Sequence, residues 1–335
     1  MRCRALIAPA FAAVACLLLL PAQGKPVMPE FSMEDAVRLH HLACIMLEDE
    51  AYQNVSGVPD MLQQSWDRGY APAGLTLLDV YEGRHKGLEA APAEACRFAK
   101  SVVDLTPSED EPLTTEQLDL QKEALFRLAG YREKGWGCAR DPRAAYTYME
   151  KAASMGLHKA QAELARYRMN GTGCTPDPET ALRQLVKLHQ EAPDTPNLYY
   201  YLGYMCYRGL GLKRPQIRQA VEFYKLGIKH RDANAANNLG AILERGTPVT
   251  KRNLSGALRL YHLASSWGNR EASANLQRLE FRTRIKGGTH DTSSLQKIAN
   301  GLQRVVVTLP LSAPHKRALI RRLQGNATPR PAEQP

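Results

Sequence analysis

Residues 123–156 read EALFRLAGYREKGWGCARDPRAAYTYMEKAASMG, and this phrase recurs in register along the chain. Between Tyr131 and Gly268 it occurs four times, at a spacing of 36 to 38 residues. One pair of amphipathic helices cannot bury its own apolar face, so a repeat of this length predicts stacked helix pairs that share a core. The anchor of each copy is a glycine that closes an aliphatic stretch: Gly135, Gly171, Gly209 and Gly246.

A second glycine follows the anchor in three of the four copies. Gly137, Gly173 and Gly211 complete a Gly-x-Gly turn, whereas Pro248 takes this place in the fourth copy. Glycine adopts positive φ at little steric cost, so these residues are predicted to end the first helix of each pair. Ten or eleven residues after each anchor, an alanine begins a second apolar stretch: Ala145, Ala181, Ala220 and Ala257.

The pattern within one copy predicts two helices. Leu125, Leu128 and Ala129 lie at helical spacing and give the first helix one apolar face. Asp141 followed by Pro142 is typical of a helix start, since aspartate caps the N-terminus and proline suits the first turn. The chain is therefore predicted to be all-α.

These copies resemble the Sel1-like repeat, an α/α solenoid unit related to the tetratricopeptide repeat. The first half of the family phrase is carried by LGYMCYRGLGL, residues 202–212, and the second half by KAASMG, residues 151–156. The last copy closes with WGNREA, residues 267–272, near the family's ending. A weaker copy precedes these, from Leu77 through Phe98. The resemblance implies a right-handed α/α superhelical solenoid of about five Sel1-like helix pairs with short flanking helices.

One copy departs from the family pattern. It has Leu188-His189 where the family prefers two alanines, and a proline-interrupted segment follows at residues 191–196, so less regular packing is expected there. The predicted order along the chain is a signal peptide over 1–24, an N-terminal helical segment over 25–66, a degenerate Sel1-like repeat over 67–106, a loop over 107–120, four Sel1-like repeats over 121–284, a basic helical segment over 285–324 and a disordered tail over 325–335.

The first 24 residues have the pattern of an export signal. Arg2 and Arg4 precede an apolar stretch over 5–20, and small residues at 22–24 suit a cleavage site. Two alternatives remain open, a retained membrane anchor and lipidation at Cys16. The pattern predicts an exported protein, either periplasmic or secreted, or one in the lumen of a secretory pathway.

The formal net charge of +10 is unevenly placed. Without Arg2 and Arg4 it is +8, and residues 281–335 account for all of it with ten lysines or arginines against two acidic residues. Exported proteins do not normally meet nucleic acid, so an anionic envelope or lipid surface is the partner class that this segment suits. A solvated terminal helix is the alternative. The candidate contacts with an anionic surface are Lys316, Arg317, Arg321 and Arg322.

Five cysteines remain after removal of the signal. An odd count in an oxidising compartment leaves at least one thiol free or joined to another chain. Cys138 and Cys174 occupy equivalent repeat positions, about 10 Å apart in stacked helix pairs, whereas a disulfide needs Cα atoms within about 7 Å. Cys44 with Cys96 is the other conceivable pair, and Cys206 is expected to be a small core residue.

Motifs for catalysis are missing from the sequence. It contains no P-loop, nucleophile elbow, H-E-x-x-H or paired C-x-x-C motif. His40, His41 and Cys44 form the only close cluster of metal-ligand types, and it offers two ligands on one helical face without an evident third. No catalytic residue, cofactor or metal is predicted.

Tyrosines gather in the third copy. Tyr200, Tyr204 and Tyr207 share one face of a helix, whereas Tyr199 and Tyr201 diverge from it. The three are candidates for a stacking surface in the groove of the solenoid, and the alternative is that they belong to the inter-helix core.

The resemblance implies a non-enzymatic interaction scaffold or adaptor of the cell envelope or secretory compartment. It would bind an unidentified protein or an envelope glycan in the concave groove. Some cysteine-rich relatives bind peptidoglycan-like compounds, so a cell-envelope enzyme or binder acting on peptidoglycan or β-lactam-like compounds is the alternative. An enzyme needs convergent acid, base or nucleophile groups, and none recur at matching repeat positions.

Deleting residues from Gly287 onward is expected to leave the solenoid folded and to abolish association with anionic vesicles at low salt. Each basic residue near a charged surface contributes about 1 kcal/mol at most, and salt screens the attraction. Co-sedimentation of the full-length and truncated chains with vesicles, at low salt and at about 0.5 M salt, measures the effect. Equal co-sedimentation of both chains, or binding that salt does not change, would show that the segment is only a solvated end.

Overall fold

The computed structural model describes residues 32–48, 55–106 and 112–287. The chain divides into two compact units, with the boundary between Ala90 and Ala91. The predicted signal peptide, most of the basic segment from 285 to 324 and the predicted tail lie outside the described residues.

All regular structure in the described ranges is helical, apart from one isolated bridge between Thr247 and Thr250. None of the described helices combines the length and the apolar composition that crossing a membrane requires. The first unit contains α2 (Met33–Glu48), α3 (Val58–Asp67) and α4 (Ala71–Tyr81). The second unit contains α5 (Pro92–Val103), α6 (Thr115–Lys134), α7 (Pro142–Ser154), α8 (His158–Asn170), α9 (Pro178–Glu191), α10 (Leu198–Arg208), α11 (Ile217–Lys229), α12 (Ala233–Arg245), α13 (Leu254–Ser266) and α14 (Arg270–Gly287).

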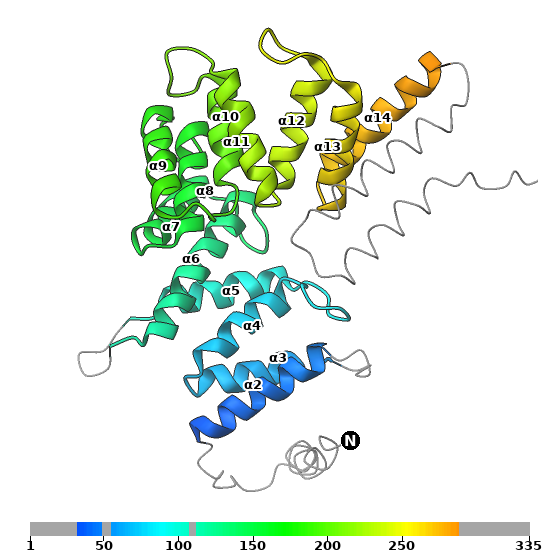
Figure 1. Ribbon diagram of the computed structural model, residues 1–335. Coiled ribbons are helices and arrows are strands. Elements are labelled where there is room, and N and C mark those ends of the chain that lie inside the picture. The colour runs from blue at the N-terminus through cyan, green and yellow to red at the C-terminus, as the bar shows by residue number, and fades with distance from the viewer. Residues whose placement is uncertain (1–31, 49–54, 107–111, 288–335) are drawn as a thin grey trace, which may run out of the picture. The chain divides into compact units, whose positions relative to one another are not determined.

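Helices of the second unit pack in sequential pairs, as the repeat predicts. Figure 1 shows consecutive helices of this unit lying beside one another. The four strong copies form the pairs α6–α7, α8–α9, α10–α11 and α12–α13, and α14 follows as a further first helix. We call α6, α8, α10, α12 and α14 the first helices, and their partners the second helices. The predicted all-α repeat fold is confirmed.

The anchor glycines end the first helices in the left-handed region. Gly135 and Gly171 have φ 72° and ψ 32°, and Gly209 has φ 73° and ψ 24°. Gly246 keeps φ at 73° but has ψ 162°, so the copy with Pro248 in its turn leaves the helix in a different direction. The turn therefore depends on whether a second glycine is present.

The second glycine of the turn allows a close approach to the preceding helix pair. A Cβ atom on Gly137 would lie 1.8 Å from the carbonyl oxygen of Pro92, and one on Gly173 would lie 1.9 Å from that of Pro142. Real Cβ atoms essentially never come this close to another atom. Each turn thus rests on the first residue of the preceding second helix, and this contact stacks one pair on the next.

The same contact shows what α5 is. Pro92 begins α5 as Pro142 begins α7, and Ala95 is fully buried three residues on, as Ala145 is in α7. By its contacts α5 is therefore a second helix. The unit boundary at Ala90 divides the predicted degenerate repeat over 67–106. That its first half is the first helix of this repeat therefore stays a prediction.

The start of α6 differs from the predicted loop over 107–120. The helix begins at Thr115, because Thr114 and Gln117 form a capping box in which each side chain bonds to the other's backbone N–H. This Thr-x-x-Gln signal lies inside the acidic, proline-containing stretch that suggested a loop.

The core within each pair follows a rule of complementary size. In each of the four pairs, the first helix has a small buried residue six positions before its anchor glycine. The second helix has a large buried residue four positions after the alanine of its repeat (Ala145, Ala181, Ala220 or Ala257). A Cβ atom on Gly203 would lie 2.6 Å from the ring of Tyr224, and one on Gly240 would lie 2.9 Å from the ring of Tyr261. The equivalent combinations of the first two pairs are Ala129 with Met149 and Ala165 with Leu185, all buried.

Replacing Gly203 by Ala should lower the free energy of unfolding by about 1–3 kcal/mol, because the new methyl group overlaps the buried Tyr224 ring. Adding Tyr224→Met recreates the Ala–Met combination of the first pair and should recover part of the loss, with a coupling energy of about 1 kcal/mol or more. Urea unfolding of the single and double variants measures both.

Gly130→Ala is the matched control, since Gly130 lies on first helix α6 with nothing within 4 Å of its added Cβ. This change should stabilise the chain by roughly 0.5–1 kcal/mol. Equal effects of Gly203→Ala and Gly130→Ala would contradict the size rule.

Candidate functional site

Neighbouring first helices are joined by ion pairs that repeat with the fold. Glu133, two residues before its anchor glycine, accepts two bonds of 2.8 and 2.7 Å from the guanidinium of Arg166 on α8. Glu244 holds the same position on α12 and accepts two bonds of 2.7 Å from Arg278 on α14. We call this series of contacts between neighbouring first helices the ion-pair ladder, and the glutamate and arginine positions between two neighbouring first helices a rung.

The Glu133 rung is linked to its surroundings by further bonds. The Tyr167 hydroxyl donates to Glu133 at 2.9 Å, and Arg166 also donates to Glu163 at 2.7 Å. Glu163 in turn accepts from the hydroxyl of Tyr201 on α10. Burial alone would raise the pKa of Glu133, but the bonds from Arg166 and Tyr167 outweigh it, and the pKa is lowered. The carboxylate is an ionised structural acceptor.

Glu244 makes the other rung in a buried position, with 8 % of its surface exposed. The hydrogen bond from Arg278 is the main cause that lowers its pKa, and the hydroxyl of Tyr261 contributes a bond of 2.9 Å. Tyr261 belongs to second helix α13, so this rung connects α12, α13 and α14. Bidentate pairs of this kind fix geometry as well as charge.

The two middle rungs of the ladder carry no ion pair. Between α8 and α10, Met169 takes the position of the glutamate and Tyr204 that of the arginine. Between α10 and α12, Tyr207 takes the position of the glutamate and Ala241 that of the arginine. Tyr200 lies one turn from Tyr204, with ring centroids 6.2 Å apart. We call Met169, Tyr200, Tyr204 and Tyr207 the aromatic step. It is an uncharged gap between charged rungs.

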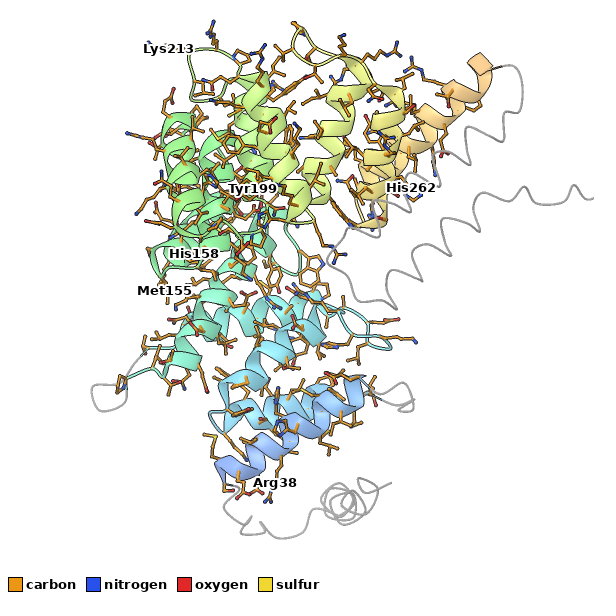
Figure 2. All side chains as sticks on the ribbon, in the orientation of Figure 1. Arg38, Met155, His158, Tyr199, Lys213 and His262 are labelled. Atoms are coloured by element: carbon orange, nitrogen blue, oxygen red, sulfur yellow. The ribbon has the colours of Figure 1, made fainter. Side chains whose placement is uncertain are left out.

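Two of the five tyrosines on α10 belong to the core. Tyr199 and Tyr201 are 4 % and 5 % exposed, and Figure 2 marks Tyr199 inside the helix stack. Tyr200, Tyr204 and Tyr207 are only partly buried. The three lie on one face of α10, and Tyr200 and Tyr207 also pack against the buried core residues around them.

Within the aromatic step, the hydroxyl of Tyr200 is held in its neutral form. Burial raises the pKa of Tyr200, and nearby Tyr204 adds to this. The guanidinium of Arg208 lies 5.9 Å from the centre of the Tyr204 ring. The step therefore offers ring faces and phenol hydroxyls, which suit stacking and hydrogen bonding rather than acid–base chemistry.

One thiol–imidazole pair exists in the first unit. Cys44 Sγ lies 3.5 Å from His40 Nε2, which also bonds to the Thr76 hydroxyl at 3.0 Å. Burial raises the pKa of Cys44 and lowers the pKa of His40, so both groups stay neutral. An activated cysteine needs the opposite shifts, a lowered thiol pKa beside a charged imidazole. Over the described ranges no three side chains of metal-ligand types gather.

Carboxylates offer no better acid. Asp232 is the one described aspartate or glutamate with a net raised pKa, which burial causes, and it caps α12 by accepting from the backbone N–H groups of Asn234 and Ala235. Its position is explained by the helix start.

Other predicted residues lie elsewhere. The seven turn glycines lie between helices and carry no side chain of the ladder. Lys316, Arg317, Arg321 and Arg322 lie outside the described residues. The bridges considered for Cys138 with Cys174 and for Cys44 with Cys96 are both missing, because all five described cysteines are free thiols. Cys206 is buried at 2 % exposure.

Sequence reasoning missed the four charged residues of the ladder. Their signal is a glutamate followed 33 or 34 residues later by an arginine, slightly less than the repeat length. Such a spacing becomes visible only when the copies are aligned on their glycines and neighbouring copies are compared.

Lowering the pH should destabilise the second unit through Glu133 and Glu244. Both have folded pKa values below the ordinary 4.5, so their contribution is complete above that value and is lost as pH falls through the lowered pKa. Glu244→Gln should cost about 1–2 kcal/mol at pH 7, and the difference from the unmodified chain should shrink as the pH falls below 4.5 and through the lowered pKa. Urea unfolding between pH 7 and 3 measures it.

The matched control is Glu222→Gln. Glu222 pairs with Lys225 at 2.8 Å on an exposed surface, so its loss should change stability by less than about 0.5 kcal/mol. If Glu244→Gln behaves like Glu222→Gln, the ladder does not hold the first helices together.

Comparison with known proteins agrees with this geometry. The Sel1 repeat family model matches residues 122–157, 158–183, 196–232 and 233–269, which correspond to the four helix pairs. The second match ends within α9, before the proline-interrupted segment at 191–196. None of the curated proteins matches the chain significantly. Sel1 repeats generally act as non-enzymatic scaffolds for protein–protein interaction.

Solved structures of repeat proteins are similar to this chain, and the first of the two that follow supports the fold. A Sel1 repeat protein from Oxalobacter formigenes is 16% identical with a TM-score of 0.56, over 71% of this chain and 88% of that one. A protective antigen present in uropathogenic Escherichia coli strains, displaying an SLR fold, is 16% identical with a TM-score of 0.42, over 88% of this chain and 69% of that one. Residues 122–269 of this chain therefore carry four Sel1 repeats, in register on four helix pairs.

Proposed function

We propose that the chain is an adaptor that binds a protein segment on its first-helix face, with the aromatic step as the anchor. The observation that supports this most directly is the interruption of the ladder. Ion pairs at its two ends satisfy their own charges, whereas the middle leaves Tyr200, Tyr204 and Tyr207 partly uncovered.

The chemistry of the aromatic step favours a peptide with an apolar or aromatic side chain. Tyrosine and arginine are enriched among the residues that dominate binding energy, because they offer a large rigid area together with a polar group. Tyr204 and Arg208 provide this combination on one helix. Met169 adds a flexible apolar side chain that adapts to the shape of a ligand.

Charged groups beside the aromatic step define the rest of the preferred ligand. Glu133, Glu163 and Glu244 are already neutralised by arginine or tyrosine partners, so a cationic ligand gains little from them. Arg278 keeps 45 % of its side chain exposed and can donate hydrogen bonds to a carboxylate or a backbone carbonyl at the edge of the face. The preferred segment is therefore uncharged at its centre.

We also propose that the chain works outside the cytosol, in the periplasm or in a secreted or luminal form. The support is the basic start, apolar stretch and small-residue site within residues 1–24. A glycan of the envelope is the second ligand class to be tested, because sugar rings also stack on tyrosine faces.

Selection of random peptides on the immobilised full-length chain, followed by affinity measurement, tests the adaptor function. Selected peptides should share an aromatic or large aliphatic residue, and Tyr204→Ala or Tyr207→Ala should weaken binding at least about tenfold. Tyr148→Ala is the matched control, because Tyr148 is partly buried on second helix α7. Equal loss in all three variants would contradict binding at the aromatic step. If the chain instead binds envelope glycans, and Tyr204→Ala and Tyr207→Ala abolish that binding, the ligand is a glycan and not a peptide.

A further inference from the structure

Two cysteines lie near the contact between the start of α5 and the turn after α6. The close approach of Gly137 to Pro92 places the next residue, Cys138, over the first turn of α5. Cys96 lies in α5 one turn after Pro92 and is 5 % exposed. Because the Pro92 carbonyl lies on the turn of α5 that leads to Cys96, the Gly137 contact brings residue 138 beside Cys96, and Cys138 is the neighbouring side chain that acts most strongly on the Cys96 thiol.

We propose that Cys96 and Cys138 are a reversible disulfide site that joins α5 to the turn between α6 and α7. Both are free thiols in this structure, and both belong to the second unit. The juxtaposition follows from the Gly-x-Gly contact, so it is built into the stacking of the repeats. This pairing differs from both pairs that the sequence suggested.

The next repeat shows what the same contact looks like without a second thiol. Cys174 follows Gly173 as Cys138 follows Gly137, and Gly173 rests on Pro142 in the same way. The residue four after Pro142 is Tyr146, where the α5 contact has Cys96. Cys174 donates to the backbone oxygen of Tyr167 at 3.6 Å, and Cys138 donates to that of Trp136 at 3.7 Å, so the two positions differ in the residue on the preceding second helix and not in this bond. The chain therefore carries its own control position.

Oxidation would proceed by exchange with a small disulfide such as oxidised glutathione. The thiolate of Cys138, which is partly exposed, attacks one sulfur of the oxidant, forms a mixed disulfide and releases one thiolate. The thiolate of Cys96 then attacks Cys138 Sγ, the mixed disulfide breaks, and the second oxidant thiol leaves. Two protein thiols lose two electrons and two protons, and the oxidant disulfide is reduced to two thiols.

The second exchange step should be slow at neutral pH. Burial, followed by the hydrogen bond with Cys138, raises the pKa of Cys96 to about 12. Since the thiolate is the attacking species, the closing rate should rise nearly tenfold for each pH unit between about 7 and 9. The exposed mixed disulfide would accumulate first.

A closed bridge would secure the start of the repeat stack. In the second unit α5 is the first helix along the chain, and the bridge would join it covalently to the pair that follows. Terminal repeats are the least supported part of a solenoid. A covalent link between residues 96 and 138 restricts the unfolded chain and should raise the thermal midpoint by roughly 5–10 °C.

The test uses the full-length chain, reduced and then incubated with oxidised glutathione at pH 7, 8 and 9. After alkylation and digestion with trypsin without reductant, mass spectrometry should find residues 87–97 joined to residues 135–140, and dithiothreitol should separate them. The thermal midpoint should rise with the fraction of linked peptide and return on reduction.

Cys174→Ala and Cys138→Ala are the matched variants. The first should form the linked peptide as the unmodified chain does, and the second should not, with circular dichroism showing that both are folded. The proposal is overturned if the unmodified chain yields no linked peptide at pH 9, if Cys138 is found joined to Cys174, or if linkage leaves the thermal midpoint unchanged.

Discussion

The stacking of this repeat depends on the contact between the turn of one helix pair and the start of the preceding second helix. No side chain fits between Gly137 and the Pro92 carbonyl or between Gly173 and the Pro142 carbonyl. Because the two backbones touch, the distance between successive pairs is fixed by backbone geometry rather than by adaptable side chains. In the copies that have the second glycine, the Glu133–Arg166 pair and the two cysteines take their positions from this approach.

On that scaffold the first helices carry both stability and a surface for partners. A rung needs a glutamate on one helix and an arginine on the next, and where either is replaced the face becomes available for another purpose. Tyr204 stands where Arg166 and Arg278 make ion pairs, and Tyr207 stands where Glu133 and Glu244 accept them. A repeat fold can thus create a binding site by altering a few equivalent positions while its core keeps the same size rule.

Local sequence determined the fold because its signals are short-range. Registered glycines, an aspartate before proline and buried alanines at constant spacing each specify a turn or a helix without knowledge of the neighbours. The same signals misjudged the start of α6, where a capping box lies inside a loop-like stretch, and could not decide the status of residues 67–106. There the second helix is recognisable from Pro92 and Ala95, whereas the unit boundary at Ala90 separates it from α4.

What the sequence by itself determined is the repeat, its helix pairs, its turn glycines and the shared face of Tyr200, Tyr204 and Tyr207. Only the tertiary structure decided which residues meet across pairs: Glu133 with Arg166, Glu244 with Arg278, and Cys96 with Cys138. The reason is physical. A helix period fixes which residues share a face, but the offset between two stacked helices depends on how closely their backbones approach, and that distance is set by packing in three dimensions.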